Sequence, residues 1–160
     1  MKADPAQLNL LFAWLWILLG FMSGLILGIF FRGDNWLGGY TSFKRRMYRL
    51  GHISFFGLGM VNLLFWLTMQ KIPISEPLAG VVSWAFVIGG VTMPVCCAVM
   101  AHFRKAHMIF SVPVLSLIIG GVLMLVILYR SGTGVSPVGF HTGLSHPIAR
   151  HVWNARATIP

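Results

Sequence analysis

A chain of 160 residues in which 57% are hydrophobic and only 9% are charged has too little polar surface to cover a globule, which excludes an ordinary soluble domain. Lys and Arg outnumber Asp and Glu by 12 to 3. Because these basic residues lie between apolar runs, they indicate anionic lipid headgroups as partners and not nucleic acid.

The apolar residues form four runs, each near the roughly 20 residues that an α-helix needs to cross about 30 Å of hydrocarbon. We expect membrane-spanning helices at about 8–31, 50–69, 78–101 and 108–129. Short polar connectors separate the runs, which predicts an all-α membrane protein whose four transmembrane helices form an up-down bundle over residues 1–130. No cleavable signal peptide is expected, because the first run is longer than a signal-peptide core and no small-residue cleavage site follows it.

In the first run, Gly20, Gly24 and Gly28 repeat every four residues and so form a strip without side chains on one helix face. In lipid, where no hydrophobic force drives helices together, such a strip lets a second helix approach closely and gain dispersion contacts. We interpret the strip as a helix-packing surface, although glycine is also simply common in membrane helices. The partner is either another helix of this chain or a helix of another protein.

Two connectors carry most of the positive charge, and together they hold seven Lys and Arg. The N-terminus and the remaining connector hold only Lys2 and Lys71. The positive-inside rule therefore places both termini on the non-cytoplasmic side of what we expect to be a bacterial inner membrane. Fixing this topology is one role for the basic residues, and binding anionic lipid or an acidic face of a neighbouring subunit is the other. The candidate surface residues are Lys44, Arg45, Arg46, Arg49, Arg104 and Lys105.

Three histidines fall near the cytoplasmic ends of the last three runs, so an up-down bundle brings them to one side of the membrane. Two imidazoles on facing helices are able to hold the iron of a b-type haem from opposite sides. We take His52 and His102 as the candidate haem ligands, with His107 as the alternative to His102. The competing interpretation is that a histidine at a helix end lies among headgroups and hydrogen-bonds water or a carbonyl.

Away from the ends of the runs, Asn62 has the side chain with the greatest hydrogen-bonding capacity. We expect it to hydrogen-bond inside the bundle and so to hold helices together. Pro94 removes the hydrogen bond to the carbonyl four residues back and should bend its helix. The adjacent Cys96 and Cys97 are interpreted as free thiols, because a disulfide between neighbours would be strained. The runs contain no Asp or Glu, which disfavours proton-coupled transport. No nucleophile, phosphate loop or metal-ligand motif is found, so no catalytic residue and no metal site is predicted.

Residues 131–160 are rich in Gly, Ser, Thr and Pro without an apolar period, which predicts an irregular tail outside the membrane. Such a segment cannot bury a core of its own, so we expect it to lie against partner subunits. Small size, absent motifs and close-approach glycines favour a non-catalytic subunit of a larger energy-transducing or electron-transfer complex, respiratory or photosynthetic. The alternative is a b-type cytochrome that passes electrons to or from quinone, and a small channel or carrier ranks third.

Overall fold

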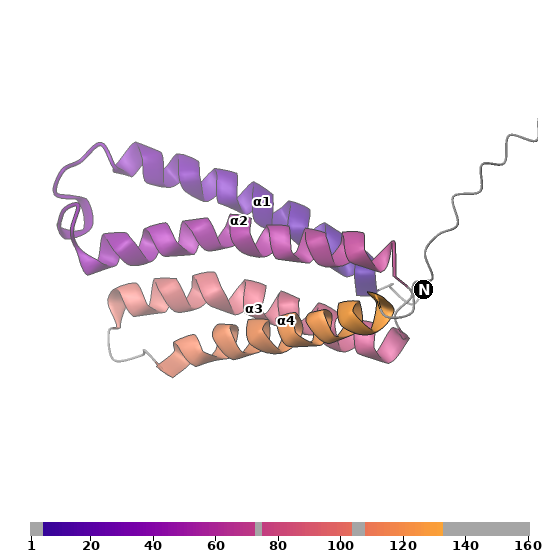
Figure 1. The fold of residues 1–160 in the computed structure, drawn as a ribbon. Coiled ribbons are helices and arrows are strands. Elements are labelled where there is room, and N and C mark those ends of the chain that lie inside the picture. The colour runs from indigo at the N-terminus through magenta and orange to yellow at the C-terminus, as the bar shows by residue number, and fades with distance from the viewer. Residues whose placement is uncertain (1–4, 73–74, 104–107, 133–160) are drawn as a thin grey trace, which may run out of the picture.

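The computed structural model describes residues 5–72, 75–103 and 108–132, and over these ranges the chain folds into four long helices without a strand (Figure 1). All four helices are long and apolar enough to cross a membrane, which confirms the predicted all-α membrane fold. The tail from residue 133 onward lies outside the described residues. The elements are α1 (Pro5–Phe30), the short 3-10 helix η1 (Trp36–Gly38), α2 (Phe43–Met69), α3 (Glu76–His102) and α4 (Ser111–Gly132).

The helices run alternately up and down, and each packs against the next in the chain, with an additional contact between α1 and α3 (Figure 1). The connection between α1 and α2 lies at one end of the bundle, together with the end of α3 and the start of α4. We call this the basic end. The start of α1 and the end of α4 lie at the opposite end, which we call the terminal end.

α2 begins at Phe43, earlier than the start near residue 50 expected from hydropathy. Ser42 explains this early start, because its Oγ accepts a hydrogen bond from the backbone N–H of Arg45 at 3.2 Å and caps the first turn. The same hydroxyl donates to the carbonyl oxygen of Leu37 at 2.7 Å and ties the connection to the helix. The basic residues that follow Ser42 therefore lie on the first turns of α2 and not in a loop.

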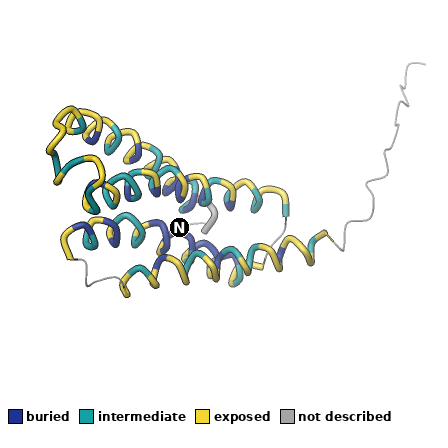
Figure 2. Tube along the Cα trace, turned by 60° about the vertical axis from the view of Figure 1, so that its left-hand side comes forward, coloured by how far each residue is buried: buried dark blue, intermediate teal, exposed yellow. Residues whose placement is uncertain are grey.

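The outer faces of the helices are apolar and exposed, while burial is confined to the faces that meet inside the bundle (Figure 2). Leu11, Phe21 and Leu125 illustrate this surface, since each side chain is more than 60% exposed. Apolar faces of this extent suit contact with hydrocarbon and would be unfavourable in water. The arrangement supports the membrane as the solvent of this protein.

Glycines set the close approach of α4 to α3. A Cβ on Gly89 would lie 2.6 Å from Leu117, and a Cβ on Gly120 would lie 2.8 Å from Phe86, so neither position has room for a side chain. An apolar cluster near the terminal end completes this contact and includes a side chain from α2. Its buried members are Phe65, Val82, Phe86 and Ile127.

Pro94 helps to join α1 to α3. Because proline has no N–H, the carbonyl of Gly90 four residues earlier has no helical partner. The indole Nε1 of Trp16 on α1 donates to that carbonyl at 3.1 Å. Phe12 stacks on Trp16 with ring centroids 3.9 Å apart, and it fills the space that the absent side chain of Gly90 leaves, where a Cβ would lie 2.6 Å from the ring.

Candidate functional site

Three polar side chains from three helices meet in the interior, and each is 0% exposed: Asn9 of α1, Asn62 of α2 and Ser83 of α3. Asn9 Nδ2 donates to Asn62 Oδ1 at 2.7 Å, and the Ser83 hydroxyl donates to Asn9 Oδ1. Asn62 Nδ2 donates to the Leu58 carbonyl at 2.8 Å. Burying polar groups is costly unless they are paired, and in this cluster the oxygen and the nitrogen of each amide have a hydrogen-bond partner. The cluster therefore fixes how the three helices are rotated and aligned.

The prediction that Asn62 hydrogen-bonds inside the bundle is confirmed, but its partner Asn9 was not singled out from the sequence. Asn9 lies at the start of the first apolar run, where an amide resembles an ordinary interfacial residue. A signal was nevertheless present, because Asn9 shares the 3–4 residue spacing of one helix face with Phe12, Ala13 and Trp16. An amide on the inward face of an apolar helix is a candidate for a buried hydrogen bond.

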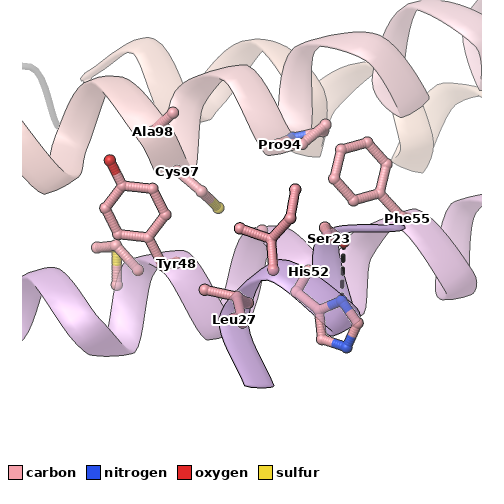
Figure 3. Close-up of a pocket in the computed structure, with 11 residues that line it drawn as sticks. Ser23, Leu27, Tyr48, His52, Phe55, Pro94, Cys97 and Ala98 are labelled. Carbon is pink, nitrogen blue, oxygen red and sulfur yellow. Dashed lines mark hydrogen bonds between the residues drawn. The ribbon is translucent and has the colours of Figure 1, made fainter. Parts of the chain in front are cut away.

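A cavity of about 280 Å³ lies between α1, α2 and α3 toward the basic end, and His52 is part of its wall (Figure 3). Figure 3 shows the Cys97 sulfur of α3 directed toward the other helices and the Ser23 hydroxyl of α1 joined to the His52 ring. Apart from these groups the lining is mostly apolar. The main lining residues are Ser23, Leu27, Tyr48, His52, Pro94 and Cys97.

The hydrogen bonds of Ser23 indicate which nitrogen of His52 is available. Ser23 Oγ lies 2.9 Å from His52 Nδ1 and 3.0 Å from the Gly20 carbonyl oxygen. Because the hydroxyl has one proton and the carbonyl can only accept, the serine donates to Gly20 and accepts from His52 Nδ1–H. This tautomer leaves the Nε2 lone pair of His52 free for a ligand.

His102 has a different environment from His52. The side chain is exposed at the end of α3, and its Nε2 lies 3.0 Å from the hydroxyl of Tyr48 on α2. Tyr48 precedes His52 by about one helical turn, so both histidines belong to the basic half of the bundle. Their hydrogen-bond partners are separate, and His107 lies outside the described residues. No group of three His, Cys, Asp or Glu side chains in the described part of the chain is arranged to hold a metal ion.

Two of the three glycines in the predicted packing strip face α2 of the same chain. A Cβ on Gly20 would lie 2.8 Å from the Phe56 ring, and a Cβ on Gly24 would lie 2.9 Å from the His52 ring. Gly28 is exposed, and a Cβ there would meet nothing within 4 Å. The strip thus serves an internal helix contact over its first two positions, and at the third it faces outward.

Arg45 differs from its basic neighbours because its side chain is only 5% exposed. Its Nη2 donates to the Phe31 carbonyl at 3.4 Å, and its guanidinium carbon lies 4.3 Å from the centre of the Phe31 ring. A cation at the carbonyl end of α1 is favourable with respect to the helix dipole. Arg45 therefore holds α1 against α2, and little of it is left for a lipid or a partner protein.

The other basic residues of the first turns of α2 are less buried than Arg45. Lys44 and Arg46 are exposed, and the Arg49 guanidinium carbon lies 4.9 Å from the centre of the Tyr40 ring. Together with the buried Arg45, these three residues are the described members of the predicted lipid or partner surface. Its remaining members, Arg104 and Lys105, lie outside the described residues.

Comparison of this chain with protein-family models, with curated proteins and with solved structures gave no match. The features that bear on function are therefore the chain's own: the buried amide cluster, the cavity beside His52 and the basic end.

Proposed function

We propose that this protein is a small, non-catalytic membrane subunit of a larger energy-transducing or electron-transfer complex. The observation that carries the proposal is an apolar groove of about 580 Å³ beside α2 and α4. α4 packs mainly along α3, so the side of α4 that faces α2 is incompletely covered. Residues that line the groove include Leu58, Leu64, Thr68, Gly121, Leu125 and Leu128.

Gly121 makes this groove suitable for a helix from another subunit. A Cβ at Gly121 would meet nothing within 4 Å, so no contact inside the described chain requires glycine there. Glycine in a helix interior costs about 1 kcal/mol relative to alanine, and a close helix contact in lipid offsets that cost. We therefore assign Gly121 to the contact with a partner helix.

The test is purification from native membranes in a mild detergent. The protein should comigrate with larger membrane proteins, and Gly121→Leu should release it because the new side chain fills the groove. Val122→Phe adds similar bulk to an exposed α4 residue that does not line the groove, and it should leave the assembly intact. A solitary monomer from native membranes would contradict the proposal.

The second candidate function is a b-type cytochrome that exchanges electrons with quinone. The Ser23–His52 hydrogen bond favours it, because a histidine that ligates iron usually donates its other ring N–H to a neighbouring group. Spectra of the purified protein, oxidised and then reduced, should show a Soret band that His52→Ala removes. The His102→Ala and His107→Ala variants would then identify the second ligand. A protein without a Soret band would end this candidate.

We also propose that both termini lie on the non-cytoplasmic side of a bacterial inner membrane, because the excess of Lys and Arg lies at the basic end. Alkaline phosphatase, which folds only outside the cytoplasm, should be active when fused to the C-terminus. It should be inactive when fused after residue 42. The reverse pattern would invert the topology.

A further inference from the structure

A second cavity, of about 480 Å³, lies at the basic end, where the α1–α2 connection, the start of α2 and the end of α3 come together. It differs from the cavity beside His52 because two of its lining side chains, Lys44 and His102, can carry positive charge. These two residues come from different helices. The complete lining is Leu37, Gly38, Ser42, Phe43, Lys44, Ala101 and His102.

The hydrogen bond of His102 leaves one ring nitrogen for a ligand. The Tyr48 hydroxyl lies 3.0 Å from His102 Nε2. When the hydroxyl donates to Nε2, the ring proton resides on Nδ1. His102 then offers an N–H donor in addition to the three N–H donors of the Lys44 ammonium group. The cavity thus combines donors and charge, as binding of an anion requires.

Among the described residues, the basic side chains at this end form no ion pair with an acidic residue. The first turn of α2 contains no acidic residue, although its three basic residues lie at the positive end of the helix dipole, where cations are unfavourable. Asp34, the acid of the α1–α2 connection, forms no ion pair with them in the described part of the chain. Even the buried Arg45 has an Nε atom without a hydrogen-bond partner. A bound anion would offset this excess charge.

The position of the cavity along the membrane normal indicates the source of the anion. A helix of 27 residues is about 40 Å long at 1.5 Å per residue, whereas the hydrocarbon core is about 30 Å thick. The ends of α2 therefore extend into the headgroup layer, and Lys44 lies at such an end. Tyr40 and Phe103, each more than 60% exposed, provide apolar surface nearby. A phosphate at this depth is part of a phospholipid headgroup.

We propose that this cavity binds the phosphate group of an anionic phospholipid, with Lys44 and His102 as its donors. The site is distinct from the groove beside α4, so it does not depend on the proposed complex. It also gives His102 a role other than haem ligation, and the two roles exclude one another because both use the imidazole.

The experiment measures binding of phosphatidylglycerol to the purified full-length protein in a neutral detergent, by native mass spectrometry across a lipid titration. Phosphatidylglycerol should bind at least about tenfold more tightly than phosphatidylcholine, because the choline ammonium of phosphatidylcholine offsets the charge of its phosphate and is repelled by Lys44. Lys44→Gln and His102→Gln should each remove most of that preference. Far-UV circular dichroism should show unchanged helix content, since both side chains are exposed.

Arg46→Gln is the matched control. It removes one charge from the same helical turn, but Arg46 is exposed and does not line the cavity, so its effect should be no more than about threefold. Equal losses in Lys44→Gln and Arg46→Gln would overturn the site in favour of diffuse surface attraction. Inorganic phosphate that displaced the lipid at similar concentration would overturn the lipid assignment. Equal binding of the two lipids would overturn the proposal entirely.

Discussion

α1, α2 and α3 are joined by polar contacts that cross the interior, whereas α4 is joined to α3 chiefly by apolar packing against glycines. In the first unit, amides from two helices bond directly, and Trp16 reaches the carbonyl that Pro94 leaves free. On α4, Ser116 donates to the Ala85 carbonyl at 2.6 Å, and one flank of the helix borders an open groove. In lipid, apolar side chains have similar surroundings before and after association, so close packing at small residues and buried polar contacts select which helices pair.

The comparison predicts that added bulk is most harmful inside the three-helix unit. Gly90→Leu should lower the free energy of unfolding by about 3 kcal/mol or more, because its side chain would displace the ring of Phe12 and part α1 from α3. Gly121→Leu should not lower it and should raise it by up to about 1 kcal/mol, since nothing lies near that position in the chain itself and leucine removes the cost of glycine in a helix interior. Unfolding in mixed micelles, followed by circular dichroism, measures both variants. Similar losses would break the comparison.

Removing one amide from the buried cluster should be the next largest effect. Asn9→Leu removes the donor to Asn62 Oδ1 and one acceptor of the Ser83 hydroxyl, so we expect a loss of about 1–2 kcal/mol in the free energy of unfolding. The triple variant Asn9→Leu, Asn62→Leu, Ser83→Ala should lose less than the sum of the three single variants, because no polar group is then left unpaired. Simple additivity would argue against a connected cluster.

The contact at Pro94 can be isolated with a double-mutant cycle. Trp16→Phe removes the indole donor to the Gly90 carbonyl and should cost about 1 kcal/mol. Pro94→Ala restores a backbone N–H that can donate to the same carbonyl within α3. In the Pro94→Ala background, Trp16→Phe should therefore cost clearly less. An unchanged cost would show that Trp16 acts through stacking on Phe12 alone.

The smallest effect is expected on α4. Ser116→Ala removes a hydrogen bond to the Ala85 carbonyl, and interhelical hydrogen bonds in membranes average about 0.6 kcal/mol. The variant leaves no buried polar group without a hydrogen bond, because the Ala85 carbonyl still accepts from a backbone N–H within α3. If Ser116→Ala destabilised the protein as much as Asn9→Leu, the distinction between the three-helix unit and α4 would fail.

Some of this architecture could be predicted because it depends on local composition. Four apolar runs of membrane-spanning length predicted four helices. The clustering of Lys and Arg in two of the connectors predicted which helix ends lie together at the basic end of the bundle. The start of α2 was placed too late, because hydropathy does not detect a charged first turn. The only sequence signal for this early start is one serine, Ser42, whose side chain caps the first turn.

Tertiary structure alone decided which polar and small residues meet, because that depends on how each helix is rotated about its axis. Asn9 and Asn62 are 53 positions apart, and nothing in their local sequences pairs them. Gly90 and Gly28 look alike in the sequence, yet one receives the ring of Phe12 and the other faces outward. Hydropathy is a property of each local stretch of sequence, and it therefore specifies how many helices cross the membrane. Which face of each helix points inward depends on side-chain contacts among all four helices.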